Sequence, residues 1–176
     1  MLTLAILGFL FEQPLHAYEL RARIGGLTGQ VRRTSDGALY PAINRLLAAG
    51  HLTRHQEAGA SGIPRQVLTL TQAGRDELLR RLARPAQLEI SDRAAFQALL
   101  AFLGLLADSR AQAAVLRRRL DYLDQPAPHL GEVRPDPEGG AGDPFREGLI
   151  QIALATREAE RNWLRGMLDR LEAACA

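Results

Sequence analysis

Apolar residues in the first half of the chain recur at helical spacing, then alternate, and then return to helical spacing. A period near 3.6 residues predicts an amphipathic helix, and a period of two predicts a half-buried strand. Gly25–Gly26 and Gly50 are expected to end the second and third helices, and Pro85 follows the fourth. The predicted elements are helices over 2–11, 16–24, 35–50 and 71–84 and strands over 52–57 and 65–70.

The third predicted helix has one apolar face and one outer face of unusual composition. The apolar face, which we expect to be buried, carries Leu39, Ala42, Ile43, Leu46 and Leu47. The outer face holds small, flat and hydrogen-bonding groups with no acid among them: Gly37, Tyr40, Pro41, Asn44, Arg45 and Ala48. Such a face suits a nucleic-acid groove, and an ordinary amphipathic helix with a solvated outer face is the alternative. For Tyr40, packing in the core beside the second helix is a further alternative.

The start of this helix combines a side chain able to cap with two cations. Ser35 can accept a hydrogen bond from the first turn, and Arg32 and Arg33 lie just before it. Two arginines would repel the positive end of the helix dipole unless an anion lies between. A phosphate bound there would remove the conflict, whereas two exposed loop arginines are the alternative. Pro41 leaves the carbonyl of Gly37 without its usual partner, which a purely structural helix would rarely choose.

The second half of the chain has helical periodicity on both sides of a stretch rich in Pro and Gly. Ser91 or Asp92 can cap a helix whose apolar stripe begins at Phe96, and Ser109 can cap the next, over 110–124. On that second helix the apolar positions share one side, and the triplet Arg117–Arg119 is expected elsewhere. Residues 126–143 are predicted to form a long loop.

The last predicted helix, over about 143–174, has an apolar band too broad for one contact within a small domain. The band consists of Leu149, Ile152, Ala153, Thr156, Trp163, Leu164, Met167 and Leu171. Its width predicts a partner helix, most simply from a second copy of the chain, and packing wholly within the chain is the alternative.

Composition and charge narrow the class of protein. Residues 1–84 carry 11 Arg against six acids, and residues 85–176 carry 11 Arg against 14, so the suspected reading helix lies in the basic half. All basic side chains are Arg, which suits phosphate and guanine but is equally explained by a GC-rich genome. The single Cys175 excludes a disulfide framework, and the apolar runs are shorter than the ~20 residues of a membrane span. We therefore expect a cytoplasmic protein with no membrane association.

Three helices followed by a two-stranded hairpin is the order of elements in a winged helix-turn-helix domain, in which the hairpin is the wing. Arg65 lies at the root of that wing and is expected to contact a DNA phosphate. The sequence thus predicts a mainly α fold with a two-stranded β wing over residues 1–84. Residues 85–176 are predicted to form an all-α dimerisation domain, which would also hold any effector.

Several motifs together resemble the PadR family of bacterial transcriptional regulators, named for control of phenolic acid decarboxylase. The most specific motif is Ser35-x-Gly37-x-Leu39-Tyr40-Pro41-Ala42-Ile43-x-Arg45-Leu46. It is preceded by a second motif, Pro14-Leu15-His16-Ala17-Tyr18-Glu19-Leu20. It is followed by Pro64-Arg65 and by Leu70-Thr71-x-Ala73-Gly74. Ala17, Ala38 and Val67 depart from the usual pattern. The C-terminal part resembles the longer subgroup through Glu160-Arg161-Asn162-Trp163-Leu164. The resemblance implies a homodimer through C-terminal helices, two winged heads spaced for an inverted repeat, and repression relieved by a small molecule.

The first hypothesis is accordingly a homodimeric DNA-binding repressor. Its expected base contacts are Ala38, Tyr40 and Asn44, and its expected phosphate contacts are Arg32, Arg33, Ser35, Gly37 and Arg65. An apolar pocket for a small aromatic or drug-like effector could be lined by Phe96, Phe102, Trp163 and Met167, with simple core packing as the alternative.

The second hypothesis is a winged protein-interaction module or co-activator acting with another regulator. An enzyme is the third and has little support, because His51 and His55 have no third ligand nearby and no catalytic constellation is evident. No catalytic residue, metal site or cofactor is therefore predicted.

Overall fold

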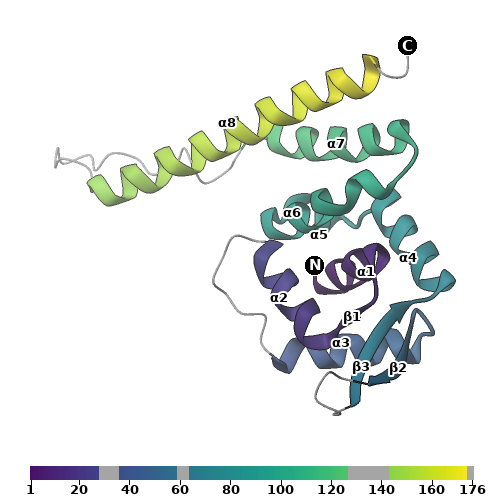
Figure 1. The fold of residues 1–176 in the computed structure, drawn as a ribbon. Coiled ribbons are helices and arrows are strands. Elements are labelled where there is room, and N and C mark those ends of the chain that lie inside the picture. Colours follow the sequence, from purple (N-terminus) through teal and green to yellow (C-terminus); the bar gives the residue numbers. More distant parts are fainter. Residues whose placement is uncertain (28–35, 59–63, 127–142, 174–176) are drawn as a thin grey trace. The chain divides into compact units, whose positions relative to one another are not determined.

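The computed structural model describes residues 1–27, 36–58, 64–126 and 143–173. The chain forms two compact units, Met1–Asp108 and Ser109–Ala176. The turn expected between the two wing strands, over 58–64, and the predicted loop over 126–143 lie almost entirely outside the described residues. The described part is mainly helical with one small antiparallel sheet, which confirms a winged helix followed by a helical C-terminal region (Figure 1).

The first unit contains the winged helix and the helices that follow it. In chain order it consists of α1 (Leu2–Glu12), β1 (Leu15–His16), α2 (Ala17–Leu27), α3 (Asp36–Ala48), β2 (Leu52–Ala58), β3 (Pro64–Leu70), α4 (Gln72–Ala83), α5 (Gln87–Ser91), α6 (Arg93–Phe102) and the 3₁₀ turn η1 (Leu103–Leu105). Asp92 is the cap of α6, because its carboxylate accepts a hydrogen bond from the Ala95 N–H at 2.7 Å.

The sheet has the order β1-β3-β2, with all neighbours antiparallel. Leu52 pairs with Leu70, so the hairpin register places two apolar residues opposite each other at its inner end. The prediction of a two-stranded wing missed β1, which adds only Leu15 and His16 to the outer side of β3. Two residues are too few to produce an alternating pattern.

The core of the first unit is centred on α1, which is apolar nearly all round. Neighbouring elements contact this helix from several sides, namely α2, α3, α4, α6 and β3 (Figure 1). Its buried residues are Leu4, Ala5, Ile6, Leu7, Gly8 and Leu10. A helix covered by so many neighbours needs no polar face, which explains its composition.

Gly8 is required by the close approach of α6. A Cβ atom at this position would lie 2.5 Å from the ring of Phe102, which packs edge-on against Phe9 with ring centroids 5.1 Å apart. Phe96 and Leu99 of α6 are also buried, at 1% and 0% exposure. α6 therefore belongs by packing to the first unit, which runs past residue 84 to Asp108. A functional division at 84–85 stays a prediction.

Two local expectations about helices differ from the structure. Gly25–Gly26 does not end α2, which continues to Leu27. Glycine costs only about 1 kcal/mol in a helix interior, and burial of Ile24 on the same helix can offset this. The short helix α5 was not predicted, because five residues give no clear period.

The second unit pairs α7 (Ser109–Asp124) with the C-terminal part of α8 (Pro144–Ala173), and the other part of α8 extends beyond α7 (Figure 1). Leu164, Leu168 and Leu171 are the buried residues of α8. Arg119, expected away from the apolar side of its helix, is instead 2% exposed. Within the described ranges, no helix has the length and apolarity needed to cross a membrane.

Candidate nucleic-acid interface

The inner face of α3 is fixed in the core of the first unit. Leu39, Ala42, Ile43 and Leu46 are between 1% and 6% exposed, as their helical spacing predicted. The helix ends in a Schellman motif: the Gly50 N–H donates to Leu47 O at 3.0 Å and the His51 N–H to Leu46 O at 2.9 Å. Gly50 has φ +72°, a conformation that favours glycine.

The outer face of α3 is exposed along its described length. Gly37, Ala38, Tyr40 and Asn44 are all exposed, and the exposed fraction of Tyr40 is 50%. The alternative that Tyr40 packs in the core is therefore wrong. Arg32, Arg33 and Ser35, the other predicted contacts near this helix, lie outside the described residues.

Pro41 lies inside α3, as the sequence indicated. It has no N–H to donate to the carbonyl of Gly37. The carbonyl of Pro41 itself accepts a hydrogen bond from Nε of Arg45 at 3.3 Å, so the arginine side chain lies back along the helix.

The hairpin beside α3 presents further polar side chains. Arg65, the predicted phosphate contact, is exposed on β3 and has Glu57 as its partner in the register. The Glu57 carboxylate lies 3.0 Å from Nε2 of His55. Arg54 on β2 was not predicted as a site residue, yet its Nη2 donates to Oδ1 of Asn44 at 3.1 Å.

The C-terminal end of α3 is joined to the sheet and to α4 through Thr71. Its hydroxyl donates to Gly50 O at 2.7 Å and accepts from the Gly74 N–H at 3.0 Å, and its N–H donates to His51 O at 3.0 Å. A Cβ on Gly74 would lie 2.2 Å from His51 O, so only glycine fits there. The predicted cap at Thr71 is confirmed, and the same residue holds the C-terminal end of α3.

Two more side chains of the winged head, one exposed and one half-buried, were not among the predicted contacts. Tyr18 on α2 is 70% exposed, although it entered the sequence prediction only as part of a motif. His16 of β1 places its Nδ1 3.2 Å from the carbonyl oxygen of Gln66. The signal that could have identified Tyr18 is its position two residues before the buried Leu20, which places it on the opposite side of α2.

A lowered pKa occurs on α4, away from α3. Hydrogen bonds from Arg80 lower the pKa of Glu77 to about 2; burial opposes the shift, and Arg81 adds a further hydrogen bond and charge. Glu77 in turn raises the pKa of Arg80. This cluster stabilises α4 and presents no free carboxylate to a ligand.

The four predicted effector residues are divided between the units. Phe96 and Phe102 are buried in the core of the first unit, at 1% and 3% exposure. Trp163, which is 44% exposed, and Met167 lie on α8 in the second unit.

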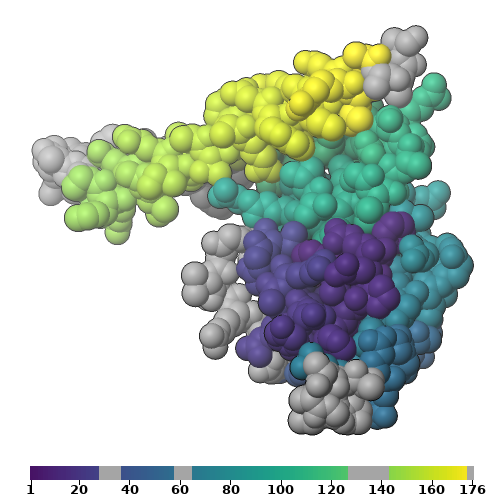
Figure 2. Space-filling view, in the orientation of Figure 1, coloured from purple at the N-terminus to yellow at the C-terminus, as the bar shows by residue number. Residues whose placement is uncertain are grey.

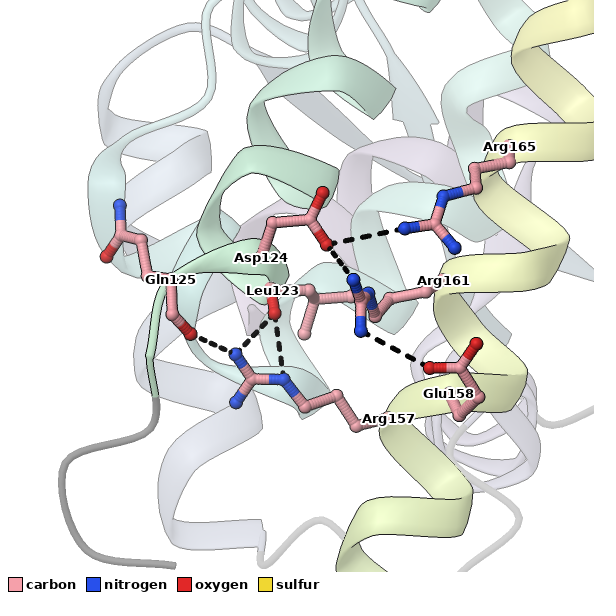
Figure 3. A network of polar contacts seen from close by, with 7 residues as sticks. All are labelled: Leu123, Asp124, Gln125, Arg157, Glu158, Arg161 and Arg165. Carbon is pink, nitrogen blue, oxygen red and sulfur yellow. Dashed lines mark hydrogen bonds and ion pairs between the residues drawn. The ribbon is translucent and has the colours of Figure 1, made fainter. Parts of the chain in front are cut away.

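A hollow in the second unit lies where the end of α7 meets the middle of α8, and polar contacts line it (Figure 3). Arg157 donates to the carbonyls of Leu123 and Gln125, and Arg161 lies 2.6 Å from the Asp124 carboxylate. None of the four predicted effector residues lines this hollow. Among the described residues, no three His, Cys, Asp or Glu side chains could together hold a metal ion.

Comparison with known proteins finds a family match in the winged region. Residues 6–80 match the Transcriptional regulator PadR-like family. No curated protein matches the chain.

Solved structures also resemble the chain. TA0346 from Thermoplasma acidophilum is 28% identical, with a TM-score of 0.42, over 46% of this chain and 75% of that one. Bacillus subtilis PadR in complex with operator DNA is 19% identical, with a TM-score of 0.47, over 96% and 98%. The same protein in complex with p-coumaric acid is 20% identical, with a TM-score of 0.43, over 97% and 98%. Over residues 6–80, which include α2, α3 and the hairpin, this chain is therefore similar to the PadR-like family of transcriptional regulators.

Proposed function

We propose that this chain binds double-stranded DNA sequence-specifically through the outer face of α3. The observation that carries the proposal is the contrast between the two faces of that helix. Leu39 and Ile43 on the inner face are 1% exposed, whereas Tyr40 on the outer face is 50% exposed. A helix held from below with an exposed polar outer face has the geometry of a reading helix in a major groove.

The two kinds of contact have separate roles in this proposal. Ala38, Tyr40 and Asn44 face base edges, and Gly37 and Arg65 hold phosphates. Arg32, Arg33 and Ser35 complete the phosphate contacts from the segment outside the described residues. Phosphate contacts fix the register of the protein on the duplex, and base contacts select the sequence.

The test compares Asn44→Ala with Arg65→Met on duplexes from the promoter of the protein's own gene, by fluorescence anisotropy. Arg65→Met should weaken all duplexes alike and reduce the salt slope by about 1. Asn44→Ala should lose discrimination at one base pair, worth ~1–3 kcal/mol. Wild-type protein without sequence preference would contradict the proposal and favour a protein-interaction module.

The proposed regulator is a homodimer paired through α8. Exposed apolar side chains follow that helix at alternating spacings of four and three: Phe145, Leu149 and Ile152, continued after Thr156 and Ala159 by Trp163. This is the repeat of a coiled-coil seam. The stripe is distinct from the buried face that Leu164 and Leu168 present to α7, and Figure 2 shows the first part of α8 extending beyond α7.

Dimerisation is tested with Ile152→Arg, which puts a charge in the stripe, and with the neighbouring exposed Gln151→Arg as the matched control. Light scattering should give twice 19.3 kDa for wild type and control, and the single-chain mass for Ile152→Arg. Equal masses for the two variants would contradict pairing through this stripe. A dimer would place its half-sites about one helical turn, ~10 base pairs, or a multiple apart.

Repression relieved by a small aromatic effector completes the proposal. Of the four predicted pocket residues, Trp163 and Met167 are exposed enough to meet a ligand, whereas Phe96 and Phe102 are core residues. The probe is p-coumaric acid, the ligand of Bacillus subtilis PadR in one of the structures above. Quenching of the single Trp together with release of bound DNA supports this role, and a flat titration contradicts it for this acid.

A further inference from the structure

Asn44 and Arg54 form a hydrogen-bonded pair between the reading helix and the wing. Nη2 of Arg54 donates to Oδ1 of Asn44 at 3.1 Å, and both side chains are exposed. β2 places Arg54 there because residues alternate between the faces of a strand. Leu52, two residues earlier, is 2% exposed on the same side, so Arg54 continues the α3-facing side past the end of the core.

The contact fixes which way the Asn44 amide points. A guanidinium has only donors, so it can accept nothing from the amide NH₂ and must meet the amide oxygen. The NH₂ group of Asn44 therefore points away from Arg54, with both of its hydrogens available. The guanidinium keeps further donors beside it.

Asparagine usually reads adenine, by accepting from N6 through Oδ1 and donating to N7 through Nδ2. Oδ1 keeps a second lone pair, but the remaining N–H donors of Arg54 lie beside it, so the N6 amino donor of adenine would meet other donors there. The major-groove edge of guanine offers only the acceptors O6 and N7, so it is the better match for the Asn44 NH₂ group and the remaining Arg54 donors.

We propose that Arg54 is a positioning residue that sets Asn44 to read guanine rather than adenine. The inference rests on the proposed function, since it concerns which base the outer face of α3 selects. Arg54 acts through the Asn44 amide, and loss of its side chain removes the donors beside Oδ1, which can then accept from adenine N6.

The contact is tested first without DNA. In ¹⁵N-labelled protein, Arg54→Met should shift the side-chain amide signals of Asn44, whereas Arg65→Met, the same change on the neighbouring strand, should leave them in place. Signals unmoved by Arg54→Met overturn the positioning role. Unchanged thermal midpoints establish that both variants fold.

Base choice is tested by selection from a randomised duplex library. Wild type should enrich guanine at a position that Asn44→Ala no longer discriminates, and Arg54→Met should shift that position toward adenine. Replacing this guanine by 7-deazaguanine, which lacks N7, should weaken wild-type binding by roughly tenfold and leave Asn44→Ala unaffected. Inosine, which keeps both major-groove acceptors, should bind like guanine.

Two results overturn the inference while leaving the proposed function intact. One is adenine at the Asn44-dependent position of the wild type. The other is an unchanged base preference in Arg54→Met with uniformly weaker binding, as for Arg65→Met. Failure of the wild type to enrich any sequence overturns the proposed function and this inference with it.

Discussion

Removing the carboxylate of Glu160 is expected to destabilise the second unit strongly, because it leaves the charge of Arg119 buried. The Arg119 side chain is 3% exposed, and its Nε and Nη2 lie 2.7 and 3.2 Å from the two carboxylate oxygens. Breaking a buried pair from one side costs about 3–5 kcal/mol. Since the Glu160 side chain is 21% exposed, water can reach the site, and we expect about 3 kcal/mol for Glu160→Ala, the lower end of that range.

Urea unfolding followed by the fluorescence of Trp163, the single Trp, reports on this unit. With a slope of about 1–3 kcal/mol per molar urea, the midpoint should fall by about 1–3 M. Glu158→Ala is the control, because Glu158 is 54% exposed and its pair with Arg161 should contribute less than about 1 kcal/mol. The double variant Arg119→Leu/Glu160→Leu should lie near wild type. Equal midpoints for Glu160→Ala and Glu158→Ala would refute the reasoning.

Three further predictions concern the first unit. Gly74→Ala should lower the stability measured by thermal unfolding by at least about 2 kcal/mol, since its Cβ would lie 2.2 Å from His51 O. Gly104→Ala is the control: its Cβ would meet nothing within 4 Å, so stability should change by less than about 0.5 kcal/mol. Thr71→Ala should cost about 1–2 kcal/mol through loss of the cap, and a stability within about 0.3 kcal/mol of wild type would contradict that role. Glu77→Gln should lower the free energy of unfolding by up to about 1 kcal/mol at pH 7. Because folding lowers the pKa of Glu77 from 4.5 to about 2, this difference should disappear as the pH falls through that range. A difference that does not change with pH would contradict the ion-pair explanation.

The elements of the winged head could be predicted because local signals agree there with the final packing. Leu39, Ile43 and Leu46 repeat at helical spacing and are buried, and Gly50 ends α3 with a positive φ. Thr71 caps α4. Each of these signals lies within a few residues of the feature it predicts, so one sequence is enough to identify it.

Partners across longer distances could not be predicted in the same way. The stripe that begins with Phe96, Leu99 and Leu100 predicts that one face of this helix is buried, but not that α1 covers it. Arg119 was expected away from the buried face, although it stands three residues after Leu116 and four before Leu123. That spacing places it on the apolar side, where Glu160, 41 residues away, makes its burial possible.

The candidate site shows the same limit at the level of chemistry. The sequence places Asn44 on an outward face, and from that alone an asparagine is expected to read adenine. Arg54 lies ten residues further along the chain, beyond the end of α3, and only the packing of β2 against that helix brings its guanidinium to the amide oxygen. If Arg54 sets the Asn44 amide as proposed, base choice depends on a contact between two elements, so the identity of the reading residue alone cannot specify the operator.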